Sequence, residues 1–146
     1  MLMNTATTDP SDVAAFVQTL RKLGWIDGQN LRLDIRWHEN NPERARAFAK
    51  ELVAIAPDII LTAGTSQLAV LQQATRTIPI VFLQVSDPVT QGFVTSLAQP
   101  GGNITGFTAF EFSMGPKWLD LLKQIAPSLA RVAVMFSPDT PNPSFG

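Results

Sequence analysis

The sequence contains no cysteine among its 146 residues. Disulfides, thiolate catalysis and cysteine-type zinc sites are therefore excluded, although exported proteins can lack cysteine too, so the compartment stays open. An excess of charge of one sign is also missing, because 11 basic and 12 acidic residues nearly cancel. Without a lysine or arginine cluster, there is no electrostatic reason to expect a nucleic-acid partner.

Long hydrophobic runs are absent as well. No apolar segment approaches the length of a membrane span, and the opening residues MLMNTATTDP lack the basic and apolar regions of an export signal. Apolar residues nevertheless make up 45% of the chain and charged residues 16%. A chain of this length and composition can bury the core of one ordinary domain.

Catalytic and metal-binding patterns are missing too. His38, the one histidine, stands beside Glu39 with no second imidazole and no cysteine, so we expect a solvated surface residue rather than a base or metal ligand. No G-x-S-x-G elbow occurs, and the turn Gly101-Gly102-Asn103 lacks the Lys-Ser/Thr that would follow in a phosphate loop. The sequence therefore predicts a non-enzyme with no metal and no cofactor.

The clearest structural pattern lies in the segment Pro57–Pro88. Two short apolar runs, Ile59–Leu61 and Ile80–Leu83, are rich in β-branched residues and bounded by proline, glycine or serine, which is typical of parallel strands covered on both faces. The helical segment Gln67–Thr75 between them is too long for a hairpin and suits a crossover. This segment is therefore predicted to form a strand, a helix and a second strand.

Similar units precede and follow this one. We expect helices at Val13–Leu23, from Asn41-Pro42-Glu43 to Val53, at Val89–Leu97 and at Gly115–Ile125, and strands at Leu31–Trp37, Ile104–Phe107 and Arg131–Phe136. This alternation predicts an α/β fold, a three-layer sandwich with a parallel, doubly wound sheet and right-handed crossovers.

Small polar residues follow both central strands, where parallel sheets bind ligands. After the first strand, Thr62–Ser66 offers hydroxyls and backbone N–H groups at a helix N-terminus, which attract an anion such as a carboxylate. Gly64 allows close backbone approach. The alternative is that Thr65 or Ser66 only caps its own helix.

Two further segments belong to the same predicted edge. In Ser86-Asp87-Pro88, Asp87 could meet a ligand amino group or could cap a helix that begins near Pro88. Asn4, Thr5 and Ala6 follow a short apolar stub and would face the same cleft, or would form a frayed terminus.

Four long stretches resemble one known family. They are Leu20–Trp37, Asn41–Thr75, Ile78–Phe107 and Lys117–Pro141. Together they are similar to the bacterial ABC-transporter substrate-binding proteins of the tryptophan/tyrosine type. Loops match as well as core segments, in the order LGW-DGQN, TAGTS, DPV–GFV and PGGNITG.

The resemblance implies a periplasmic-binding-protein-like fold, in which two α/β lobes close on a small organic molecule such as an amino acid. Residues 1–108 would form ligand-binding lobe 1, and residues 109–146 the hinge crossing and first helix-strand of an incomplete lobe 2, with Phe110 and Phe112 in the connection. Relative to the family pattern, we expect truncation at both ends. The implied ligand-binding residues are Asn4, Thr5, Ala63, Gly64, Thr65, Ser66, Ser86 and Asp87.

The resemblance also implies partners and a location. The protein would deliver its ligand to an ABC permease from a periplasmic or lipid-anchored extracytoplasmic position, and the incomplete lobe 2 favours self-association. Two alternatives are a cytoplasmic ligand-sensing module, which would need a helix-turn-helix that we do not find, and a flavodoxin-like nucleotide-binding domain.

Overall fold

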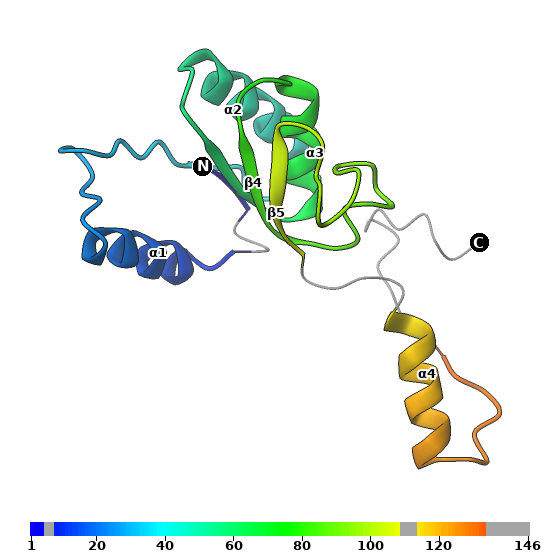
Figure 1. The fold of residues 1–146 in the computed structure, drawn as a ribbon. Helices are drawn as coiled ribbons and strands as arrows, with labels where there is room; N and C mark the ends of the chain where they lie inside the picture. Colours follow the sequence, from blue (N-terminus) through cyan, green and yellow to red (C-terminus); the bar gives the residue numbers. More distant parts are fainter. Residues whose placement is uncertain (5–7, 109–113, 134–146) are drawn as a thin grey trace.

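The computed structural model describes residues 1–4, 8–108 and 114–133 (Figure 1). Its elements are β1 (Leu2–Met3), α1 (Pro10–Lys22), β2 (Arg36–Trp37), α2 (Pro42–Ala54), β3 (Ile60–Ala63), α3 (Thr65–Ala74), β4 (Ile80–Val85), β5 (Ile104–Thr108) and α4 (Met114–Ile125). Among these described segments, none is a helix both long and apolar enough to cross a bilayer.

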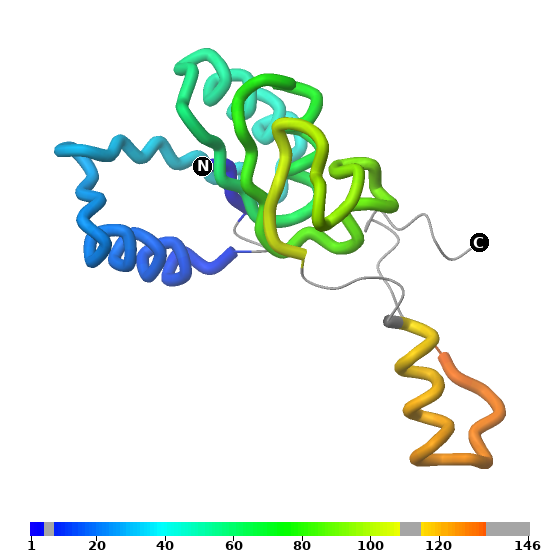
Figure 2. The backbone as a smooth tube through the Cα atoms, viewed as in Figure 1, coloured from blue at the N-terminus to red at the C-terminus, as the bar shows by residue number. Residues whose placement is uncertain are grey.

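The five strands form one sheet in the order β2-β1-β3-β4-β5, and every neighbouring pair is parallel. The central pair is β3 and β4, with Ile60 opposite Ile80 and Ala63 opposite Leu83. The predicted α/β fold with a parallel sheet is therefore confirmed. Figure 2 shows how the chain returns to the same end of the sheet before each new strand.

One face of the sheet carries the hydrophobic core. Helices α2 and α3 pack against each other beside this face (Figure 1). Helix α2 begins as its sequence predicts, because the Asn41 side chain accepts hydrogen bonds from the backbone of Glu43 and Arg44 (3.0 and 3.1 Å). The core is a cluster of buried apolar side chains: Leu2, Ala49, Leu52, Ile60, Leu68, Leu71, Ile80, Phe82, Val85, Phe93, Val94 and Ile104.

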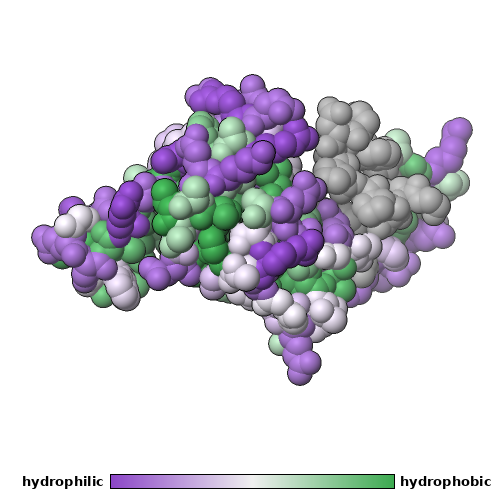
Figure 3. Space-filling model, turned by 90° about the horizontal axis from the view of Figure 1, so that it is seen from above, coloured by the Kyte–Doolittle hydropathy of each residue, from purple (hydrophilic) through white to green (hydrophobic). Residues whose placement is uncertain are grey.

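Within the described residues, the opposite face of the sheet is only partly covered. Leu61, Val81 and Leu83 alternate with the core residues and are half-buried, and Phe107 on β5 is 71% exposed. Helix α1 fully buries only Val13 of its apolar stripe, while Val17 and Leu20 are half-buried and Phe16 is exposed. Figure 3 shows apolar surface open to solvent between polar regions.

Helix α4 is amphipathic, as its spacing predicts, but its apolar side chains are exposed. They are Trp118, Leu119, Leu121, Leu122 and Ile125. Residues 109–113, which include Phe110 and Phe112, lie outside the described part of the chain, and so does most of the predicted strand Arg131–Phe136. The three described residues of that segment, 131–133, are not in a strand.

Two local predictions were wrong. The segment Val89–Leu97 forms turns and bends rather than a helix. Gly92 is left-handed (φ +73°), and the backbone N–H groups of Phe93 and Val94 both donate to the carbonyl of Pro88. The predicted strand Leu31–Trp37 shrinks to its last two residues, because Leu33 instead donates its N–H to the Asp27 side chain (2.9 Å).

Gly106 tests the packing of β5 on β4. A Cβ atom added there would lie 2.1 Å from the carbonyl oxygen of Phe82 and 2.6 Å from its Cγ. We expect Gly106→Ala to lower the free energy of unfolding by about 2–3 kcal/mol, because backbone and a buried ring must both shift. Chemical denaturation measures this. Gly102→Ala, where a Cβ meets nothing within 4 Å, is the control, and equal stabilities of the two variants would contradict the packing.

Candidate functional site

The carboxyl ends of four strands meet at one edge of the sheet. Leu2 pairs with Thr62 and Met3 with Trp37, while Ala63 pairs with Leu83. The next residues, His38, Asn4 and Gly64, therefore leave the sheet at nearly the same level. This edge is where open parallel sheets bind ligands, and we refer to it as the carboxyl edge.

The β3–α3 loop places an uncapped helix N-terminus at the carboxyl edge. Gly64 is the N-cap residue, in a conformation that favours glycine (φ +97°), and no side chain among the described residues caps α3. The alternative role of Thr65 or Ser66 as the cap is therefore wrong. The Thr65 hydroxyl is half-buried and has no hydrogen-bond partner among the described residues. Ala63 and Gly64 are buried, and because neither has a polar side chain, they can offer a ligand only backbone hydrogen-bonding groups.

The loop after β4 reaches the same edge. Ser86 and Asp87 are both half-buried, and the Ser86 hydroxyl has no partner within the described segments. The Asp87 carboxylate accepts a hydrogen bond from the Thr90 N–H (3.3 Å), so it stabilises a turn rather than a helix. The Gln91 side chain donates to the Ser86 carbonyl (2.6 Å) and braces this loop.

Asn4 lies at the carboxyl edge, but its side chain is already hydrogen-bonded within the protein. It is buried, its Oδ1 accepts from the Asn40 N–H (3.0 Å), and its Nδ2 donates to Asn40 Oδ1 (3.3 Å). Asn4 therefore joins the end of β1 to the β2–α2 loop. Thr5 and Ala6 lie outside the described residues.

His38 corrects one prediction from the sequence. It is 4% exposed rather than solvated. With the Gln67 amide oriented so that both of its polar atoms have partners, Gln67 Oε1 accepts a hydrogen bond from His38 Nε2 (3.1 Å). Burial, and then the nearby Arg44 charge, lower the pKa of His38. No group of three His, Asp or Glu side chains that could hold a metal occurs in the described part.

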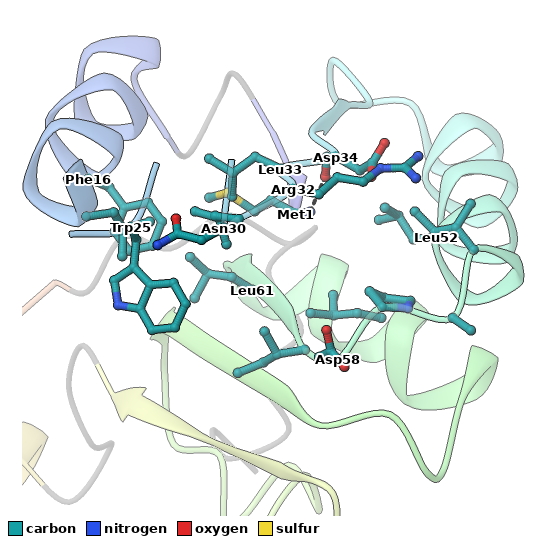
Figure 4. A pocket seen from close by; sticks show the side chains of 17 residues that line it. Met1, Phe16, Trp25, Asn30, Arg32, Leu33, Asp34, Leu52, Asp58 and Leu61 are labelled. Carbon is teal, nitrogen blue, oxygen red and sulfur yellow. Dashed lines mark hydrogen bonds and ion pairs between the residues drawn. The ribbon is translucent and has the colours of Figure 1, made fainter. Parts of the chain in front are cut away.

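A cavity of about 600 Å³ lies at the opposite edge of the sheet (Figure 4). Phe16 from α1, Trp25 from the following turn and Leu52 from α2 line it, together with the first residues of β3. Three charged side chains also line it: Arg32 and Asp34, which form an ion pair (2.9 Å), and Asp58. Sequence reasoning missed this cavity, because it arises where α1 stands away from the sheet.

Comparisons with known proteins point to one family. A family model described as "ABC transporter substrate binding protein" matches residues 9–144. A curated tyrosine-binding protein from Clostridioides difficile is 30% identical over 122 residues.

Solved structures agree with this match. A conserved domain protein from Vibrio cholerae is similar at 32% identity and a TM-score of 0.67. The ligand-free, open structure of a substrate-binding protein with adhesive properties from Clostridium difficile matches at 30% and 0.68. An ABC domain in complex with L-Trp from Streptococcus pneumoniae matches at 25% and 0.69.

The matches cover most of this chain but less than half of each relative. The curated protein is matched over 84% of this chain and 35% of its own length. The three solved structures cover 86%, 86% and 87% of this chain, and the chain covers 43% of each of them.

The buried His38 predicts how stability depends on pH. Its pKa is lowered in the folded state, so the unfolded chain takes up a proton first as the pH falls below about 6.5. We expect the free energy of unfolding to decrease from that pH down to the lowered pKa and then to level off. Urea denaturation at a series of pH values measures it.

His38→Gln is the control, because it removes the titrating group while other groups remain. The Met1 amino group also titrates here, since burial lowers its pKa to about 6, and it is unchanged in the variant. A pH profile for His38→Gln that matches the wild type would contradict the buried, neutral histidine.

Proposed function

The chain belongs to the family of ABC transporter substrate-binding proteins, and we propose that it forms the ligand-binding lobe of a solute-binding protein for an ABC importer. The ligand is a small organic molecule, and we propose an amino acid with an aromatic side chain. The names of two relatives, one tyrosine-binding and one in complex with L-Trp, support this choice. The single observation that carries the proposal is the uncapped N-terminus of α3 at the carboxyl edge.

The β3–α3 loop suits the carboxylate of an amino acid. The first N–H groups of α3, at Thr65, Ser66 and Gln67, have no intrahelical acceptor, and no side chain caps them in the described structure. A helix N-terminus stabilises an anion by about 0.3–1 kcal/mol, and charge-assisted hydrogen bonds to it are stronger than neutral ones. The unpartnered Thr65 hydroxyl would add a further donor.

The loop after β4 suits the amino group. β4 is the direct neighbour of β3, so Ser86 and Asp87 follow the adjacent strand end. Asp87 supplies the negative charge that an ammonium group needs, and its Oδ2 is not used in the turn contact with Thr90. The Ser86 hydroxyl can accept or donate a hydrogen bond.

We propose that residues 1–108 form lobe 1 and that residues 109–146 cross to a second lobe. The exposed apolar face of α4 supports this division, because such a face packs against a partner layer in a complete lobe. In the whole protein, closure of the second lobe over the carboxyl edge would add ligand contacts that exist only in the closed state. That closed state would be what the permease recognises.

The proposed role is binding and delivery without chemistry. Family members typically act outside the cytoplasm, and we propose a periplasmic or lipid-anchored position for this protein. We also propose that the uncovered α4 face favours self-association when no second lobe is present.

The proposal is tested by nuclear magnetic resonance with L-tryptophan and L-tyrosine at millimolar concentrations. We expect the amide signals of Gly64–Gln67 and Ser86 to shift upon titration, because these groups face the ligand. Thr65→Val should weaken binding about tenfold by removing one hydroxyl contact.

Thr77→Val makes the same chemical change at an exposed position before β4, at the other end of the sheet, and should bind as the wild type does. Shifts confined to the cavity beside α1, or no shifts with either amino acid, would contradict the proposed site.

A further inference from the structure

Two buried polar side chains stand directly behind the β3–α3 loop. His38 follows β2 and Gln67 lies in the first turn of α3, and they are 4% and 1% exposed. We propose that His38 is a positioning residue, which sets the conformation of the ligand-binding loop Ala63–Ser66 through Gln67. This inference rests on the proposed function of that loop.

Gln67 connects the histidine to the loop. Its Oε1 accepts from His38 Nε2 (3.1 Å), which leaves its amide nitrogen facing the loop. That nitrogen lies 2.9 Å from Ser66 Oγ and 3.3 Å from the carbonyl oxygens of both Ala63 and Gly64. Donation to these carbonyls holds them toward the interior, so the N–H groups of the next residues stay directed out of the helix end.

His38 can act in this way because its own position is rigid. Its backbone N–H donates to the Met3 carbonyl (3.1 Å), which continues the β1–β2 ladder. The next two residues, Glu39 and Asn40, are both left-handed (φ +51° and +60°), and Asn40 is bonded to Asn4. Glu39 is also paired with Arg44 on α2. The histidine is therefore fixed from β1 and from α2.

The protonation state of His38 determines which hydrogen bonds its two imidazole nitrogens can make. Donation from Nε2 leaves Nδ1 as the unprotonated nitrogen, and Nδ1 is buried without a partner among the described residues. Burial makes a second proton on Nδ1 costly, and the backbone of His38 itself offsets only part of that cost. The charged groups near it are Arg44 and Glu39, and the elements β1 and α3, which also pack against it, carry no titratable side chains.

The experiment follows the Thr65 and Ser66 amide signals as the pH is lowered, without ligand. In the wild type we expect these signals to move together with the His38 imidazole protons. In His38→Gln the amide nitrogen of the new side chain can take the place of Nε2 as donor. This variant should keep the wild-type loop signals but lose their pH dependence.

Binding of L-tryptophan and L-tyrosine provides the second readout. His38→Gln should bind within about twofold of the wild type, whereas His38→Leu and Gln67→Met, which remove one partner, should bind about tenfold more weakly. Leu52→Ala is the control for lost stability, because Leu52 is buried in the core at the far end of α2. It should lower the melting temperature without changing the loop signals or the affinity.

The experiments distinguish a failure of the positioning role of His38 from a failure of the proposed ligand-binding function. Loop amides that do not follow the His38 titration, or a Gln67→Met variant with wild-type loop signals, would overturn the positioning role. If neither amino acid binds, the proposed function is wrong, and the ligand-free amide titration still decides the role of His38. If His38→Leu does not fold, the same comparison can be made between the wild type, His38→Gln and Gln67→Met.

Discussion

The parallel pairing of β3 with β4 is the constraint on which the rest of the structure depends. Four matched pairs, from Ile60 opposite Ile80 to Ala63 opposite Leu83, fix both strands in register. Because parallel strands end at the same edge, this register brings Thr65 and Ser86 to one side of the sheet although they are far apart in sequence. Without it, the Thr65 and Ser86 hydroxyls and the N-terminus of α3 would not lie at one edge of the sheet.

The same sheet has two different faces. Residues such as Phe82 point into a core closed by α2 and α3, while the alternate residues, Val81 and Phe107 among them, face a side that α1 covers poorly. In the part of the chain that the structure describes, helices therefore cover one face of the sheet well and the other face only in part. The chain covers 43% of the length of each of the three solved relatives.

The sequence predicted those helices and strands whose ends are determined by interactions between residues close together in the chain. The cap and proline at Asn41-Pro42 gave the start of α2, and the two apolar runs gave β3 and β4 with the loops that follow them. The burial of His38 could not be predicted in this way, because it depends on Gln67, far away in sequence. The supposed helix at Val89–Leu97 failed because apolar spacing alone does not reveal that Gly92 turns left-handed.

The central claim is that the carboxyl edge receives the ligand, and a crystal structure of this chain soaked with L-tryptophan tests it most directly. We expect density for the ligand carboxylate within hydrogen-bonding distance of the N–H groups of Thr65 and Ser66. Density for the amino acid in the cavity lined by Phe16 and Trp25, with the carboxyl edge empty, would contradict it.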